Sequence, residues 1–192
     1  MRKSKLIAFC GIDGCGKSTQ IKLMKEFLEP KYKVMVARLD YFPLNKMGNN
    51  KVLDTILKFR SGFEITKYFS FLQLFDLNNY DYVLCDRHLL CYLSYAIAYD
   101  VKKIDLVRKA LSFIKEPDLT LYFDVDVDRA LMRIENRGEK EIDKSENAET
   151  LSKAKLGYAY LMESMDNVFK IDANGDALET FESVQKVFSK KM

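Results

Sequence analysis

A glycine-rich segment near the N-terminus combines the residue types that hold a phosphate group. Residues 11–19 read Gly-Ile-Asp-Gly-Cys-Gly-Lys-Ser-Thr and match the pattern G-x-x-x-x-G-K-[ST]. Glycines let the backbone curl so that successive N–H groups face one anion. Lys17 is expected to reach the β- and γ-phosphates of a nucleotide, and Ser18 to ligate Mg²⁺ through its hydroxyl. The segment predicts a site for ATP and Mg²⁺ formed by Gly11, Asp13, Gly14, Cys15, Gly16, Lys17, Ser18 and Thr19.

An Asp-Arg pair, Asp86 and Arg87, ends a second apolar run that starts at Tyr82. If that run is a buried strand, the pair lies at its carboxyl end, where ligands bind in open α/β sheets. Asp86 is expected to hold Mg²⁺ through water, and Arg87 to bind a second phosphate through two parallel hydrogen bonds. The alternative is a structural ion pair that closes the strand. His88 is the only histidine and is interpreted as a packing or helix-start residue, without a catalytic role.

Three arginines, Arg129, Arg133 and Arg137, recur every four residues on a predicted helix. Like charges at this spacing repel one another, and an anion among them would relieve the repulsion. In phosphoryl transfer, an arginine delivered by a closing lid stabilises the charge on the transferred group. We expect Arg133 and Arg137 to act in this way.

The polar stretch that follows the arginines, from Gly138 to Asn147, is interpreted as part of a lid that spans residues 133–150 approximately. Arg133 is also expected to contact the bound nucleotide. The alternative is an ordinary solvated helix face, on which Glu135 and Glu139 screen the arginines.

Short apolar runs alternate with helical patterns along the chain. Five runs read as strands: Leu6–Cys10, Val34–Leu39, Tyr82–Cys85, Leu119–Val125 and Val168–Ile171. Several are apolar at nearly every position, as expected for parallel strands that are covered on both faces. The helical patterns between them have apolar faces that include Ile21, Met24 and Leu28; Leu106, Ala110, Phe113 and Ile114; and Val184, Val187 and Phe188. This alternation predicts an α/β fold with a parallel sheet.

Length and composition favour one domain, residues 1–192, and a small anionic ligand. Hydrophobic residues make up 48%, and the net charge is only +3, from 31 basic and 28 acidic residues. Proteins that coat nucleic acid usually have a larger and more clustered basic excess, so we expect no nucleic-acid partner. The apolar run Leu6–Phe9 is too short for a signal peptide or a membrane span, which predicts a cytoplasmic protein without a membrane partner.

These elements, in this order, resemble the thymidylate kinase family. The resemblance is carried by residues 9–20, by Cys85-Asp-Arg-His88, by residues 117–126 and by residues 130–138; residues 157–161 and 170–173 also match. It implies a three-layer α/β/α P-loop kinase fold with a central five-stranded parallel sheet and a helical lid. It also implies a homodimer that transfers the γ-phosphate of ATP to dTMP, giving dTDP and ADP.

The resemblance implies roles for single residues. Asp13 matches the loop acid that contacts the 3′-hydroxyl of the acceptor sugar. Arg87 matches the arginine that holds the acceptor phosphate, and Tyr95 matches the tyrosine that lies against the deoxyribose. Some members carry a catalytic arginine where this chain has Gly14, so a lid cation must supply that charge here. Arg133 and Arg137 are the first candidates, followed by Lys140, Lys144 and Lys153.

Most of the sequence differences from the family lie at positions that are expected to recognise the base of the acceptor. Phe42 and Pro43 keep only part of a Phe-Pro-x-Arg segment, and Phe63 and Lys67 have the spacing of the thymine-sensing Phe and Arg. Phe42, Phe63 and Lys67 are therefore predicted to contact the acceptor; for Phe63 and Lys67 the alternative is a packing aromatic and a surface cation.

Other functions remain open at this stage: a kinase for another nucleoside monophosphate, a deoxynucleoside kinase, or a nucleotide-binding regulator without turnover. A nucleoside kinase needs a general base, and Cys10 stands where related enzymes have glutamate. A GTPase is disfavoured because residues 45–48 lack the final Asp of a guanine motif.

Overall fold

A computed structural model describes residues 4–38, 79–100, 104–112, 114–137 and 146–192. Five parallel strands form one sheet in the order β2-β3-β1-β4-β5. They are β1 (Lys5–Cys10), β2 (Val34–Ala37), β3 (Tyr82–Asp86), β4 (Leu119–Asp124) and β5 (Val168–Asp172). The predicted five-stranded parallel sheet is confirmed, with strand ends that differ from the sequence prediction by one or two residues.

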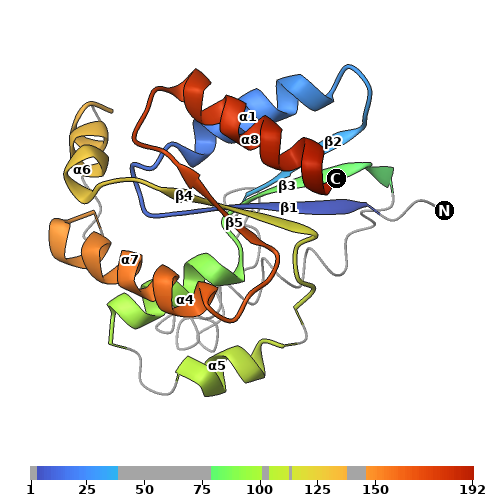
Figure 1. Cartoon of the computed structure of the whole chain (residues 1–192). Coiled ribbons are helices and arrows are strands. Elements are labelled where there is room, and N and C mark those ends of the chain that lie inside the picture. The colour runs from blue at the N-terminus through green and yellow to red at the C-terminus, as the bar shows by residue number, and fades with distance from the viewer. Residues whose placement is uncertain (1–3, 39–78, 101–103, 113, 138–145) are drawn as a thin grey trace, which may run out of the picture.

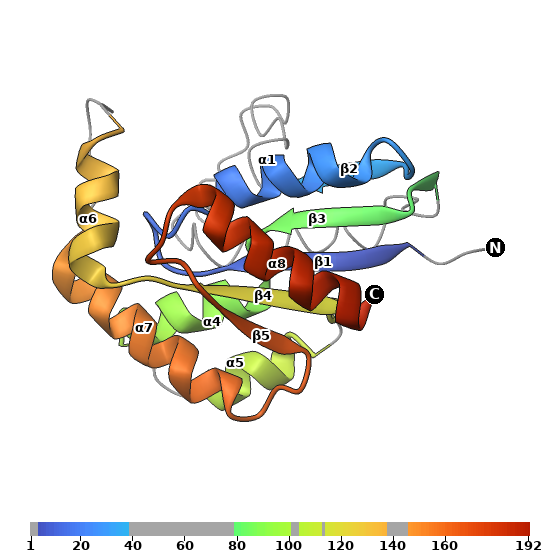
Figure 2. The same ribbon diagram turned by 45° about the horizontal axis from the view of Figure 1, so that its top comes forward.

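Helices cover both faces of the sheet and make three layers (Figures 1 and 2). One face carries α1 (Lys17–Leu28) and α8 (Ala177–Lys191), and the other carries α4 (Leu89–Ala98), α5 (Ile104–Ala110) and α7 (Ala148–Met162). Helix α6 (Val127–Glu135) lies beyond the carboxyl end of β4. The carboxyl edge of the sheet is therefore bordered by the start of α1 and by α6.

The central strand β1 shows why the sheet needs cover on both sides. Residues Leu6 to Cys10 are each at most 1% exposed. Successive side chains of a strand point to opposite faces, so an unbroken buried run requires helices above and below. Phe9 stacks on Phe123 of β4 with ring centroids 5.8 Å apart, and α1 buries Ile21, Met24 and Leu28 against the sheet.

Capping side chains mark the starts of two helices. Asp176 and Glu179 form a capping box at the start of α8, and Asn147 caps α7 by accepting from the Thr150 N–H. Helix α5 ends at Ala110, whereas the predicted apolar face continued to Ile114, which is buried beyond the helix. None of the helices in the described ranges is both long enough and apolar enough to cross a membrane.

Helices α4 and α7 approach most closely at Gly157. A Cβ added there would lie 2.7 Å from the Ser94 carbonyl oxygen, which is closer than real contacts allow. The missing side chain lets the two helix backbones come together. The residues that follow, Tyr95 on α4 and Tyr158 on α7, are thereby brought under the carboxyl edge of β1, where both contact the phosphate loop.

Gly157→Ala should destabilise the protein. A solvent-exposed helix would gain about 0.5–1 kcal/mol from this change, but overpacking against the Ser94 backbone should cost about 1–3 kcal/mol. Urea unfolding measures the difference, and Ser152→Ala on the exposed face of α7 is the control, expected within about 0.5 kcal/mol of wild type. A more stable Gly157→Ala variant would contradict the close approach of α4 and α7.

Candidate active site

The loop that joins β1 to α1 lies at the carboxyl edge of the sheet. Gly14 has a φ of +79°, and a side chain there would collide with the Ala130 backbone of α6, so a larger residue does not fit. Gly16, with a φ of +93°, caps α1, and no side chain accepts from the N–H groups of the first helical turn. A helix start without a side-chain cap, and with the positive end of the helix dipole, is suited to bind an anion.

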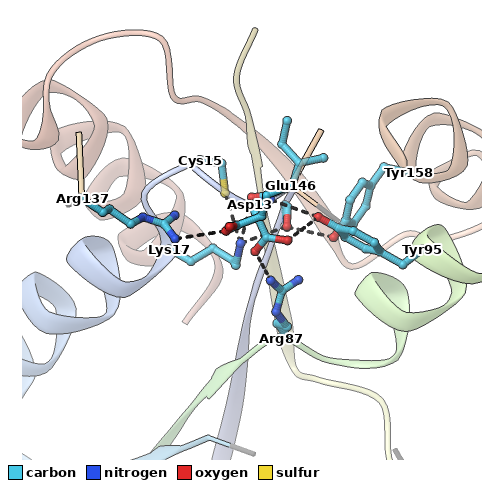
Figure 3. Close-up of polar contacts among 10 residues, drawn as sticks. Asp13, Cys15, Lys17, Arg87, Tyr95, Arg137, Glu146 and Tyr158 are labelled. Carbon is cyan, nitrogen blue, oxygen red and sulfur yellow. Dashed lines mark hydrogen bonds and ion pairs between the residues drawn. The ribbon is translucent and has the colours of Figure 1, made fainter. Parts of the chain in front are cut away.

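Lys17 is held inside this loop. Its ammonium nitrogen lies 3.0 Å from the Gly11 carbonyl oxygen, 2.9 Å from that of Ile12 and 3.6 Å from Cys15 Sγ (Figure 3). The residue is only 7% exposed, so its charge depends on these partners. They are neutral, and a phosphate that enters the loop can replace them with a stronger partner.

Asp13, Arg87 and Tyr95 form a connected group beside the loop. The Arg87 guanidinium donates to Asp13 Oδ1, and the Tyr95 hydroxyl donates to Asp13 Oδ2 at 2.7 Å (Figure 3). Burial alone would raise the pKa of Asp13, but Arg87, Lys17 and Tyr95 together lower it below its usual value. Burial and the Asp13 charge raise the pKa of Tyr95, so its hydroxyl stays protonated and can donate.

The backbone of Arg87 has an unusual conformation. Its φ is +71°, in the left-handed region that non-glycine residues rarely adopt, and its N–H donates to the Phe9 carbonyl of β1 at 3.1 Å. Burial lowers the pKa of the guanidinium, but Asp13 raises it well above its ordinary value, so the charge is permanent. The guanidinium also lies 5.6 Å from the centre of the Tyr95 ring.

Two residues at this edge could contribute to a magnesium site. Ser18 and Asp86 both line the cavity above the loop, and Asp86 forms an ion pair with Arg38 at 3.4 Å. Mg²⁺ usually takes one or two protein oxygens and completes its shell with water and phosphate oxygens. Within the described ranges, no cluster of three acidic, His or Cys side chains could hold a metal by itself. A hydroxyl and a carboxylate fit a metal that arrives with a nucleotide.

Arg129, Arg133 and Arg137, two of which fall in the predicted lid, have partners other than Glu135 and Glu139. Arg129 donates to the Asn174 carbonyl, and Arg133 donates to that of Gly175 at 2.9 Å. Arg137 pairs with Glu146 at 3.3 Å (Figure 3). Arg129 and Arg133 thus join α6 to the turn between β5 and α8, and Arg137 joins the two ends of the segment 138–145, which lies outside the described residues.

One cavity of about 580 Å³ collects most of the predicted residues. Its lining includes Asp13, residues 14–19, Asp86, Arg87, Arg133 and Arg137. Gly11 and Tyr95 contact this lining through Lys17 and Asp13. Lys153 does not line it and instead pairs with Glu149 and Asp100 on the α4–α7 side. Phe42, Phe63, Lys67, Lys140 and Lys144 lie outside the described residues.

Part of the cavity wall was not predicted. Residues 175–177 and Thr180 at the start of α8 line it, and the Gln20 side chain of α1 donates to the Ala177 carbonyl at 2.8 Å. The capping pattern Asp176 to Glu179 locates a helix start in the sequence, but only the sheet order places that start beside the phosphate loop. The role of Tyr158 was missed for the same reason, since its partner Gly11 is 147 positions away. Glu146 lies in the predicted lid stretch, but no pairing with Arg137 was predicted for it.

Comparisons with known proteins identify the family of this chain. The family model "Thymidylate kinase" matches residues 72–184. A probable thymidylate kinase of Methanococcus maripaludis strain C7 is 32% identical over 168 residues, which cover 86% of this chain and 81% of the relative. The solved thymidylate kinase of Candida albicans superposes with a TM-score of 0.72 at 18% identity, covering 98% of this chain and 92% of that one.

A second solved structure, deoxyadenosine kinase from M. mycoides with bound dATP, has a TM-score of 0.67 and 21% identity, covering 96% of this chain and 99% of its own. At these identities both solved structures support the fold alone. They confirm the predicted three-layer P-loop kinase architecture, which is shared by kinases with different acceptors.

Asp13→Asn should reduce stability in a pH-dependent way. Above the ordinary carboxyl pKa of 3.8, the unfolding free energy of the wild type should exceed that of the variant by on the order of 3 kcal/mol, because the variant removes the carboxylate that pairs with the Arg87 guanidinium. Since the pKa of Asp13 is lowered by folding, this difference should shrink as pH falls below 3.8 and Asp13 is protonated. Urea unfolding at several pH values measures it, with the exposed Glu182→Gln as control. A difference that stays constant down to pH 3 would argue against the ion pair.

Proposed function

The chain belongs to the thymidylate kinase family, and on this premise we propose that it transfers the γ-phosphate of ATP to dTMP, giving dTDP and ADP. The observation that carries the proposal is the cavity at the carboxyl edge of the sheet. Its lining includes both the phosphate loop with Lys17 and the Arg87 side chain, so two phosphorylated molecules would be able to meet there end to end.

ATP is the proposed donor. The N–H groups of residues 11–19 and the start of α1 would surround its phosphates, and Lys17 would exchange the carbonyls of Gly11 and Ile12 for phosphate oxygens. Arg133 lies beside the turn at Gly175 and would contact the nucleotide. Mg²⁺ held by Ser18, and through water by Asp86, would neutralise charge on the β- and γ-phosphates.

The proposed acceptor site is the group of Asp13, Arg87 and Tyr95. Arg87 has five N–H donors, so it can hold an acceptor phosphate while it keeps contact with Asp13. Asp13 and Tyr95 would then face the sugar, as the family resemblance implies. The contacts of Phe42, Phe63 and Lys67 with the base remain predictions from the sequence.

The chemistry requires cations more than a base. A phosphate monoester is already anionic near neutral pH, so it can attack the γ-phosphorus of ATP in line without losing a proton to the protein. The obstacle is repulsion between two anions, which Lys17, Arg87, Mg²⁺ and the lid arginines would offset. Because the Ala130 backbone leaves no room for a side chain at position 14, a lid cation would supply the remaining charge, and Arg133 and Arg137 are the first candidates.

A deoxynucleoside kinase is the nearest rival, and the charges at the site disfavour it. Such an enzyme must take a proton from a hydroxyl group. Burial raises the pKa of the Cys10 thiol well above its usual value, so this residue stays neutral and cannot act as a base. The lowered pKa of Asp13 makes its carboxylate a weak base as well.

Two broader proposals remain: the family resemblance implies that the enzyme is a homodimer, and the short apolar run Leu6–Phe9 favours a cytoplasmic location. Light scattering of the purified protein tests the first, and fluorescence microscopy of a tagged chain tests the second.

Acceptor choice is tested by ADP release from Mg²⁺ and ATP, with each common nucleoside monophosphate and nucleoside offered in turn. We expect the highest turnover with dTMP. Lys17→Ala should lower kcat by about 100- to 1,000-fold or more, because a cation that stabilises the transferred charge is lost. Lys22→Ala, an exposed cation on the same helix, should leave kcat unchanged. Faster turnover with thymidine than with dTMP would defeat the monophosphate assignment, and acceptor-independent ADP release would indicate an ATPase or a regulator.

Arg87→Lys should raise the KM for dTMP by about 10- to 100-fold, because lysine keeps the charge but loses the planar pair of donors. The KM for ATP should change far less. Steady-state kinetics with each substrate varied separately measures the two values, and Arg108→Lys is the control, since Arg108 donates to Ser164 in a solvent-exposed hydrogen bond and does not line the cavity. An equal rise in both KM values would place Arg87 outside the acceptor site.

A further inference from the structure

Tyr158 lies beneath the phosphate loop, although no step of the proposed reaction uses it. Its side chain is fully buried, and its hydroxyl accepts a hydrogen bond from the Gly11 N–H at 3.2 Å (Figure 3). The two residues are 147 positions apart, so this contact joins the start of the loop to helix α7.

The contact fixes the part of the loop that holds Lys17. Gly11 donates its N–H to Tyr158 and accepts from the Lys17 ammonium at 3.0 Å through its carbonyl. Because the two peptide groups flanking Gly11 are both bonded, neither can rotate without losing a hydrogen bond. The directions of the loop N–H groups that would face phosphate therefore depend on the Tyr158 hydroxyl.

A second tyrosine makes the same kind of contact two residues further on. The Asp13 N–H donates to the Tyr95 hydroxyl at 3.1 Å. Tyr95 and Tyr158 each follow the residue at which α4 and α7 touch, Ser94 and Gly157. The loop therefore rests on two hydroxyl groups whose spacing is fixed by one close helix crossing.

The position of the Tyr158 hydroxyl is itself fixed by packing. Its ring lies against the Tyr122 ring of β4, with centroids 4.7 Å apart and an angle of 31° between the planes. A buried ring packed in this way has no other place to move. Phenylalanine would keep the ring and remove only the hydroxyl, leaving the Gly11 N–H without its partner.

Helix α7 also touches the lid segment at its other end. Glu146 lies just before the helix and pairs with Arg137, while Tyr158 lies 12 positions later. Helix α7 begins at Ala148, so at about 1.5 Å per residue its rise from there to Tyr158 is roughly 15 Å, which connects the partner of a lid arginine to the phosphate loop. A shift of α7 along its axis would change both contacts together.

We propose that Tyr158 is a positioning residue for the phosphate loop and couples the loop to helix α7. The part of the proposal that concerns phosphoryl transfer rests on the proposed function, whereas the part that concerns binding of a nucleoside diphosphate does not. The residue acts on the donor nucleotide through the loop backbone and contacts neither substrate.

Tyr158→Phe should raise the dissociation constant for Mg²⁺ and ADP, measured by calorimetry, by about tenfold, which corresponds to the loss of one hydrogen bond. The KM for ATP should rise similarly, while the KM for dTMP should change by less than about threefold, because Tyr95 and Arg87 hold that side. Tyr122→Phe is the matched control, since it removes from the adjacent ring a hydroxyl that donates to Asp124 of β4 at 3.4 Å. Its affinity for ADP should equal that of wild type.

An ADP affinity of Tyr158→Phe within twofold of wild type would overturn the proposal, as would an equal loss in Tyr122→Phe. If Tyr158→Phe does not fold, amide exchange of the wild-type protein by NMR decides instead: slow exchange at Gly11 supports the contact, and exchange as fast as in an exposed loop refutes it. If the wild type phosphorylates no nucleoside monophosphate, the proposed function fails, but the ADP comparison still decides the role of Tyr158.

Discussion

Positive charge held at the carboxyl edge of the sheet is the constraint on which this structure depends. Lys17 and Arg87 are largely shielded from water, so each needs a partner within the protein. Lys17 takes the carbonyls of Gly11 and Ile12, and Arg87 takes the Asp13 carboxylate. The turns of the phosphate loop, the glycines at its bends and the tyrosines beneath it all serve to bring those partners within reach.

The kind of partner separates the cations into two groups. Lys17, Arg129 and Arg133 are bound to neutral carbonyl oxygens, whereas Arg87 and Arg137 are bound to carboxylates. A phosphate dianion competes easily with a carbonyl, because a hydrogen bond between two charged groups is roughly twice as strong as a neutral one. Donor phosphates can thus displace the carbonyls at little cost. Arg87 instead has to add a phosphate while it keeps Asp13, which its planar set of five donors permits.

Local signals explain what could be predicted from the sequence. The phosphate loop is one continuous motif, and the strands are unbroken apolar runs, so both were located closely. The arginine repeat was predicted on one helix, but α6 ends at Glu135, so only Arg129 and Arg133 lie on it. Their partners at residues 174 and 175 depend on the neighbouring positions of β4 and β5, which no short window encodes. The contact between Tyr158 and Gly11 has the same origin, since it requires both the sheet order and the close approach at Gly157.

The balance of charge also bears on the kind of acceptor the site can use. Among the residues described at this edge, the cations are many, but the groups that could remove a proton are poorly suited to do so. Burial lowers the pKa of His88 to about 3 and raises the pKa of the Cys10 thiol. Arg87 and Lys17 keep the pKa of Asp13 below its usual value. None of these three groups would serve a hydroxyl acceptor as a strong base. An acceptor that is already an anion needs only to be held against repulsion, and the cations around the cavity provide that.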